Sequence, residues 1–229
     1  MANYLIIGGS RGIGRKIAEK AIEAGEKVTI VSRQRPEGLD GNFDWQEADV
    51  TADFEIDVPE EIDRLVYAPG SINLKPYKRL KKEDLQQDLE INYFGAFKTL
   101  QQALPQMQKN GNSSAVFFST VAVDTGMPFH ASIAGAKGAL EGMVRSLSAE
   151  TAPKVRMNII APSLTDTDLV ENLLNNDKKR EASIERHPMK QVASPEDIAD
   201  LAMWLLSDSA KFITGQTIKA DGGISSLKV

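Results

Sequence analysis

Short runs of apolar residues recur along the chain, and segments whose apolar residues repeat at helical spacing separate them. Most runs are too short for buried helices and are rich in Val, Ile and aromatic residues, which predicts strands. The predicted strands are Tyr4–Ile7, Val28–Val31, Phe43–Gln46, Leu65–Tyr67, Ala115–Phe118, Arg156–Ile160 and Gln216–Ile218. The predicted helices are Ile13–Ala24, Lys82–Met107, Phe129–Thr151 and Pro195–Leu206.

This alternation of strands and helices predicts βαβ units and a mostly parallel sheet that is buried on both faces. Right-handed crossovers then give a doubly wound α/β fold. We expect a single Rossmann-type domain over residues 1–229, with about seven strands and helices on both faces. The acidic, turn-rich stretch Arg33–Glu61 looks too short for a full helix. The polar segment Asn175–Lys190 is either a mobile helix or lid, or a solvated surface helix.

A glycine-rich turn directly follows the first predicted strand and opens the first helix. A sharp turn that brings the backbone close to a pyrophosphate requires glycine, and the helix N-terminus supplies N–H donors and the positive end of a dipole. The strand before the turn and the helix after it favour a dinucleotide site over an ordinary turn. The turn contributes six candidate cofactor contacts: Gly8, Ser10, Arg11, Gly12, Ile13 and Gly14.

The end of the second predicted strand discriminates between NAD and NADP. An acidic residue there would bind the ribose 2′-hydroxyl and repel a 2′-phosphate. This chain has Ser32 and Arg33 instead, and Arg11 lies within the glycine turn. Two guanidiniums that converge on one phosphate favour NADP(H). The alternative is that both arginines are solvated loop charges.

Composition narrows the chemistry further. The 229 residues include no cysteine and two histidines, which excludes a thiolate metal site and disfavours a histidine-rich one. The net charge of −5 argues against a nucleic-acid partner. No apolar run approaches the ~20 residues of a membrane span. The first residues lack the basic and apolar regions of a signal peptide, so we expect a cytoplasmic protein.

From residue 4 to residue 223, the motifs resemble in order those of the short-chain dehydrogenase/reductase family, and of its acyl-carrier-protein ketoreductases in particular. The resemblance implies that Asp49 and Val50 bracket the adenine, that Gly70 allows close backbone approach, and that Arg11 points toward the same phosphate as Arg33. Residues 67–69 read Tyr-Ala-Pro where the family has Asn-Asn-Ala. The segment after the sixth strand is similar to the loop that contacts the nicotinamide carboxamide, with candidate contacts Pro162, Thr165 and Thr167.

The resemblance also implies a reaction centre. Lys137 corresponds to the lysine that holds the nicotinamide ribose, Thr120 to the serine that orients the substrate, and Asn92 to an asparagine that holds a lysine-linked water. An asparagine in mid-helix often indicates a local break in the hydrogen-bond ladder. Helical spacing places Leu85, Leu89 and Ala96 on the face of Asn92, which favours this role over that of a surface asparagine.

The catalytic tyrosine of the family is replaced by Ile133, which can neither donate nor accept a proton. A positioned acid is worth about 10²–10⁴ in rate. At about 100° per residue, His130 shares the face of Ile133 and Lys137, whereas Ser132 lies about 140° away from Lys137. Enoyl-acyl-carrier-protein reductases of this family have their tyrosine at the same seven-residue spacing from the lysine. His130 is therefore the candidate proton donor, and the alternative is a histidine beside the pocket without that role.

These observations predict an NADP(H)-dependent oxidoreductase that transfers a hydride to a carbonyl or enoyl carbon of a small or acyl-thioester substrate. The alternative is a catalytically weak NADP-binding protein that acts as a sensor or partner subunit. Small residues crowd the helix of Lys137, which is explained either by packing on the sheet or by a homodimer or homotetramer formed through this helix. They are Ala134, Gly135, Ala136, Gly138, Ala139 and Gly142.

Overall fold

The computed structural model describes residues 1–228, and within them seven parallel strands form one sheet. The strand order is β3-β2-β1-β4-β5-β6-β7, which confirms the predicted doubly wound fold. The strands are β1 (Asn3–Ile7), β2 (Lys27–Ser32), β3 (Asp44–Glu47), β4 (Arg64–Tyr67), β5 (Ser113–Phe118), β6 (Val155–Pro162) and β7 (Thr217–Ala220). Every predicted strand is present, with ends that coincide or differ by one or two residues.

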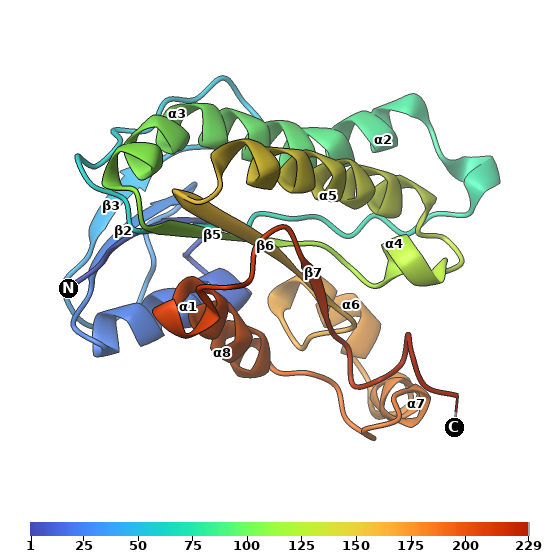
Figure 1. The fold of residues 1–229 in the computed structure, drawn as a ribbon. Coiled ribbons are helices and arrows are strands. Elements are labelled where there is room, and N and C mark those ends of the chain that lie inside the picture. The colour runs from blue at the N-terminus through green and yellow to red at the C-terminus, as the bar shows by residue number, and fades with distance from the viewer. Residues whose placement is uncertain (229) are drawn as a thin grey trace.

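Helices cover both faces of the sheet, as Figure 1 shows. On one face lie α1 (Gly12–Glu23) and α8 (Pro195–Leu206), and on the other lie α2 (Lys82–Leu89), α3 (Gly95–Asn110) and α5 (Ala131–Thr151). Tyr4 and Ile6 point to the first layer and Leu5 and Ile7 to the second, so alternate residues of β1 enter two separate cores. Both faces of the strand are therefore apolar, as a doubly covered parallel sheet requires.

The long helix predicted over Lys82–Met107 is interrupted. A π-helical turn, Glu90–Phe94, joins α2 to α3 and contains the buried Asn92. The extra residue of a π turn rotates the preceding helix relative to the following one. The expectation that Leu85 shares the buried face of Asn92 is therefore wrong: Leu85 is 42% exposed, and Asp88 is fully buried instead.

Three short helices lie outside the main layers: α4 (Ala122–Thr125), α6 (Glu171–Leu174) and α7 (Asp177–Arg186). The segment Asn175–Lys190, predicted as a lid or a solvated helix, contains α7. The C-cap residue of α7 is His187, which is buried. The His187 Nε2 lies 2.9 Å from Ser163 Oγ, which ties this segment to the loop after β6. As expected, no helix forms between β2 and β4.

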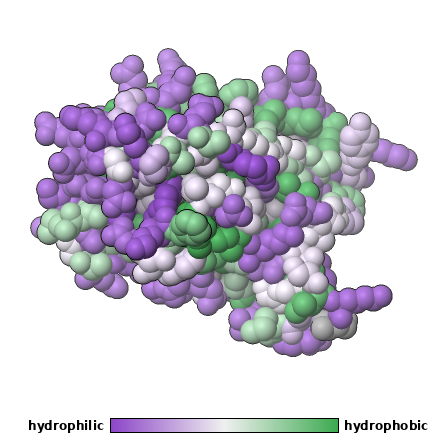
Figure 2. Space-filling view, in the orientation of Figure 1, coloured by the Kyte–Doolittle hydropathy of each residue, from purple (hydrophilic) through white to green (hydrophobic). Residues whose placement is uncertain are grey.

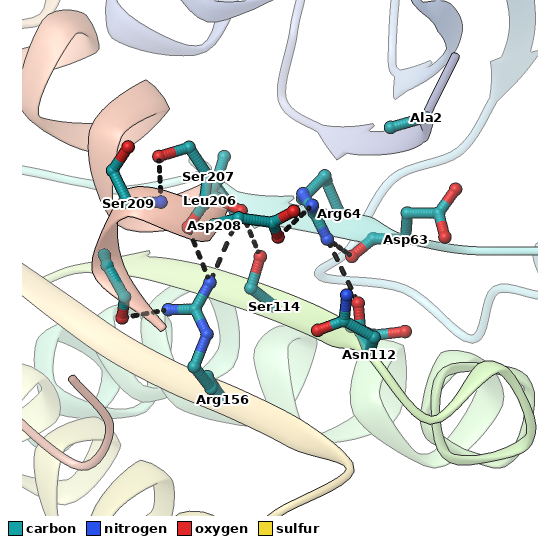
Figure 3. Close-up of polar contacts among 12 residues, drawn as sticks. Ala2, Asp63, Arg64, Asn112, Ser114, Arg156, Leu206, Ser207, Asp208 and Ser209 are labelled. Carbon is teal, nitrogen blue, oxygen red and sulfur yellow. Dashed lines mark hydrogen bonds and ion pairs between the residues drawn. The ribbon is translucent and has the colours of Figure 1, made fainter. Parts of the chain in front are cut away.

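Arg156, near the start of β6, forms hydrogen bonds to the end of α8 (Figure 3). Its Nη1 donates to the carbonyls of Leu205 at 2.9 Å and Ala210 at 3.1 Å, and its Nη2 donates to Ser207 O at 3.0 Å. These carbonyls end α8 and the turn after it, where a helix has no internal donors left. One guanidinium therefore caps α8 and fixes it against the sheet.

Candidate active site

A cavity opens where β1 and β4 end side by side. Ile7 pairs with Tyr67 across these two strands, and the chain leaves them toward opposite edges of the sheet. This is the topological switch point, at which open α/β sheets bind their ligands. The cavity has a volume of about 650 Å³, and its walls are the glycine turn, the ends of β2 and β4, and residues 167–169.

The glycine turn has the backbone that its sequence predicts. Gly8 and Gly12 have φ angles of +82° and +57°, in the region that favours glycine. A Cβ on Gly14 would overlap the carbonyl oxygen of Gly8, so the turn excludes any side chain there. Helix α1 begins at Gly12, and no side chain caps its first turn. Its N–H groups and its positive dipole end therefore face the cavity.

The cavity continues to the end of β2, where Arg33 and Arg11 are both exposed on its wall. Ser32 plays a different part, because its hydroxyl donates to Gln34 O at 2.7 Å and accepts from Trp45 Nε1 at 3.1 Å. Ser32 thus shapes the turn that presents Arg33 rather than offering a free hydroxyl.

Asp49 and Val50 line the same cavity at the predicted adenine position. The backbone N–H and the hydroxyl of Thr51 both donate to Asp49 Oδ1, and these hydrogen bonds lower the pKa of that carboxyl. Asp49 is therefore held ionised and fixed in the loop that follows β3.

The predicted nicotinamide loop divides into exposed and buried parts. Thr167 lines the cavity, and its Cγ2 lies 3.6 Å from the point that a Cβ on Gly12 would occupy. Thr165 is buried and forms an isolated bridge with Ala193. Pro162 ends β6, and its carbonyl accepts from Val121 N at 3.2 Å. Thr165 and Pro162 do not line the cavity. Of the three predicted contacts with the nicotinamide, Thr167 is the one that faces it.

Lys137 is buried on α5, and its Nζ donates to Phe118 O at 2.7 Å. Burial lowers the pKa of Lys137 to about 8, and the negative charge of Asp88 partly opposes this effect. Such a lysine changes its charge close to neutral pH. Ile133 lies one turn earlier on the same helix and is 4% exposed.

Asn92 is brought next to Lys137 from the other side. Its Nδ2 donates to Ser71 Oγ at 2.9 Å and to Asp88 O at 2.8 Å, while its buried Oδ1 has no hydrogen-bond partner among the described residues. A Cβ on Gly70 would lie 3.5 Å from that Oδ1 and 3.6 Å from Lys137 Nζ. A buried donor and a buried acceptor therefore border one point beside Gly70.

The other two predicted catalytic residues, Thr120 and His130, do not line the cavity. Thr120 follows β5, and its Oγ1 accepts from Ala122 N at 3.3 Å. His130 is the N-cap residue of α5, and its Nδ1 lies 2.8 Å from Pro128 O. Because a carbonyl can only accept, the proton is on Nδ1, and Nε2 is left for another partner.

Two polar residues behind the site, Asp88 and Ser71, are not predicted from the sequence. The buried Asp88 accepts from Ser71 Oγ at 2.6 Å and from Ser132 Oγ at 2.5 Å. Helical spacing predicts that Ser132 lies away from Lys137, and its side chain points to α2. The available signal was an acidic residue four positions before Asn92, on a helix that is otherwise polar at that point.

Neither a cluster of metal-binding side chains nor a helix that could span a membrane is found among the described residues. Residues 1–228 contain no group of three His, Cys, Asp or Glu side chains that could hold a metal ion. None of the helices in this part of the chain combines the length and apolar character that a membrane span requires.

An open parallel sheet with a glycine-lined cavity at its switch point defines a Rossmann-type fold, the class in which dinucleotides bind at this crevice. Similarity to known proteins identifies a family within this class. A family model described as enoyl-(acyl carrier protein) reductase matches residues 8–225. The 3-oxoacyl-[acyl-carrier-protein] reductase MabA of Mycobacterium tuberculosis is 31% identical over 233 residues, which cover 97% of this chain and 92% of that protein.

Two further proteins are similar to this chain over nearly its whole length. The 2,3-dihydro-2,3-dihydroxybenzoate dehydrogenase of Escherichia coli is 32% identical over 238 residues, 96% of each chain. The solved structure of a short-chain dehydrogenase/reductase from Brucella melitensis has a TM-score of 0.88 and 28% identity, and the match covers 99% of this chain and 97% of that one. The chain belongs to the short-chain dehydrogenase/reductase family of oxidoreductases.

Proposed function

We propose that this chain is an NADP(H)-dependent oxidoreductase that reduces a carbonyl, or the conjugated double bond of an enoyl group, in a small or acyl-thioester substrate. The observation that carries the proposal is the buried pair of Lys137 Nζ and Asn92 Oδ1, which border one point beside Gly70. This pair suits the ribose that carries the nicotinamide, so it would hold the hydride donor in a fixed position beside Gly70. The matching family model and the relative MabA are both named for acyl-carrier-protein substrates, which supports an acyl substrate.

The residues present fit NADP(H). The glycine turn leaves room for a pyrophosphate, and Arg11 and Arg33 suit a 2′-phosphate, with no carboxylate at the end of β2. Lys137 has two N–H groups without a protein partner among residues 1–228, and Asn92 Oδ1 is a free acceptor. Ribose hydroxyls both donate and accept, so they match this pair. When bound, the nicotinamide supplies the hydride.

The remaining chemistry falls to the side chains around the substrate. The hydride goes to the electrophilic carbon, and a proton must reach the substrate oxygen or the neighbouring carbon. Thr120 orients the substrate by its hydroxyl. His130 can donate from Nε2 only as imidazolium, since its neutral form has the proton on Nδ1.

Single-turnover oxidation of NADPH tests the proposal, with a panel of 3-oxoacyl thioesters, enoyl thioesters and small ketones. We expect measurable oxidation with at least one substrate, and its loss in Lys137→Met, which keeps the length of the side chain and removes the charge. If the wild-type protein binds NADPH but oxidises it with none of these substrates, the enzymatic proposal fails.

One observation favours a second function. Ile133 is buried at the position where the family has its proton donor, so the site is intact for binding and incomplete for acid catalysis. The second candidate is accordingly a weakly catalytic NADP-binding sensor or partner subunit. It predicts that NADPH affinity is high, that turnover is absent, and that NADPH binding changes the oligomeric state or the affinity for a partner.

A homo-oligomer is part of the proposal. Gly135 and Gly142 of α5 face open space, so packing on the sheet does not explain them. Phe94 and Phe97 are 46% and 41% exposed nearby, and Figure 2 shows hydrophobic residues over the α2 side of this layer. We infer a symmetric tetramer or dimer that packs through α5. Light scattering that gives a 25.0 kDa particle would contradict this.

A further inference from the structure

Asp88 of α2 has 0% of its surface exposed, which is rare for a carboxylate. A buried charge is tolerated when it is paired and hydrogen-bonded. Ser71 Oγ donates to its Oδ1 at 2.6 Å and Ser132 Oγ donates to its Oδ2 at 2.5 Å. Both carboxylate oxygens thus accept from a hydroxyl, which is the pattern of an ionised acid.

Lys137 supplies the opposite charge. It is buried on α5, the helix that packs against α2 and against the π turn. Asp88 is the group whose charge raises the pKa of Lys137 against the effect of burial. Ile133 occupies the adjacent turn of α5 and offers no polar atom, so no group at that position can share the charge of Lys137.

Other titratable groups face α5, but they are engaged or exposed. Asp84 of α2 pairs with Lys75, and Asp124 of α4 pairs with Lys219. Within α5 itself, Glu141 accepts from Ser119. On the remaining elements around α5, the groups are the exposed Lys82, Glu83 and Glu90, the half-buried Tyr93, and Arg156, which is bonded to the carbonyls after α8. Asp88 and Glu141 are both buried carboxylates, but Asp88 is the one whose charge raises the pKa of Lys137.

Asp88 also determines how the Asn92 side chain is oriented. The hydroxyl proton of Ser71 is directed to Asp88, so Ser71 can only accept from Asn92 Nδ2. The second N–H of that amide donates to Asp88 O. A flipped amide would place Oδ1 against two acceptors. The network therefore forces Oδ1 toward Gly70 and Lys137.

We propose that Asp88 is a positioning residue that acts from behind the site: it is the counter-charge of Lys137, and it aims the side-chain carbonyl of Asn92 at the same point. The proposal deepens the proposed function, because Lys137 and Asn92 are the residues that we assign to the cofactor ribose. It does not depend on cofactor binding for its test, since the ionisation of Lys137 can be measured in the protein alone.

The test is a pH titration of Lys137 by nitrogen-15 NMR of lysine-labelled protein, in which Lys137→Met assigns the Nζ signal. The wild-type midpoint is expected at about pH 8. Asp88→Asn keeps the shape of the side chain and removes its charge. Loss of a nearby opposite charge disfavours the ammonium form, so the midpoint should fall by about one pH unit or more.

The matched control is Glu90→Gln, which removes an exposed carboxylate two residues away and should leave the midpoint unchanged. An unchanged midpoint in Asp88→Asn, or an equal shift in Glu90→Gln, overturns the proposal. Thermal melting establishes that each variant is folded. Ser71→Ala tests the orienting role separately, since it keeps both charges and breaks the link between Asp88 and Asn92.

Ser71→Ala should leave the Lys137 midpoint in place and weaken NADPH binding about fivefold to tenfold, because Asn92 is then free to flip. Equal NADPH affinity in Ser71→Ala and wild type overturns the orienting role. Failure of the wild-type protein to bind NADPH would instead contradict the proposed function, and the NMR titration would still decide whether Asp88 is the counter-charge of Lys137.

Discussion

Replacing Ile133 by tyrosine places a phenol one helical turn before Lys137 on α5. The ammonium of Lys137 lowers the pKa of a nearby phenol because a positive charge favours phenolate. A restored acid is worth about 10²–10⁴ in rate, so reduction of a suitable ketone should rise by one or more orders of magnitude. Lys137 loses its charge above about pH 8, so the gain should be largest below that pH.

The larger ring has a separate cost. Ile133 is 4% exposed, and overpacking of a buried site typically destabilises by about 1–3 kcal/mol. Ile133→Phe is the matched control, since it adds the ring without the hydroxyl. Both variants are measured by thermal melting and by single-turnover oxidation of NADPH. If both remain folded and Ile133→Tyr reacts no faster than Ile133→Phe, a missing acid at this position is not what limits the site.

Three further outcomes are expected. His130→Ala should abolish the native reduction and leave NADPH affinity nearly unchanged in a calorimetric titration, and retained activity would exclude His130 as the donor. Arg33→Ala should weaken NADPH binding about tenfold and NADH binding little, because a hydrogen bond between charged groups is worth about 1.5–3 kcal/mol; equal losses for both cofactors would contradict a 2′-phosphate site. Arg156→Met leaves the carbonyls after α8 unpaired and should cost about 2–3 kcal/mol of unfolding free energy, or about 5–10 °C in melting temperature. Its control is Arg64→Met, which removes an ion pair to the 75% exposed Asp208 and hydrogen bonds to the carbonyls of Asp63 and Asn112 but leaves the carbonyls after α8 paired (Figure 3). This variant should lose less stability than Arg156→Met, and an equal loss would refute the capping role of Arg156.

The sheet could be predicted because the apolar residues of its strands come in short runs with turn residues between them. The errors lie at strand ends. Ser113 and Ser114 begin β5 although both are polar, since their hydroxyls donate to Ile62 O and Leu206 O. Such partners come from distant segments, and no local pattern indicates them. Hydrogen bonds of this kind make polar residues acceptable in a buried strand.

The candidate site was predictable where its residues follow strand ends. The glycine turn and Arg33 come directly after β1 and β2, so topology alone places them at one edge of the sheet. Asp88 escaped prediction because its burial depends on the π turn, which changes the rotation of α2 relative to Asn92. Uninterrupted helical spacing assigned the buried face to Leu85, and Asp88 looked like one more charge on a polar helix.

One departure from the family pattern contacts that π turn directly. Tyr67 stands where the family has asparagine, and its buried hydroxyl donates to Ile91 O at 2.6 Å, within the turn. Asp88 holds the other side of the same turn through Asn92. The turn that carries Asn92 is thus fixed by hydrogen bonds that involve no side chain at position 133. Asn92 and Lys137 are fixed by hydrogen bonds to Ser71, Asp88 and Phe118, so their positions do not depend on the side chain at position 133. Ile133→Tyr should therefore alter proton transfer while the positions of Lys137 and Asn92 stay the same.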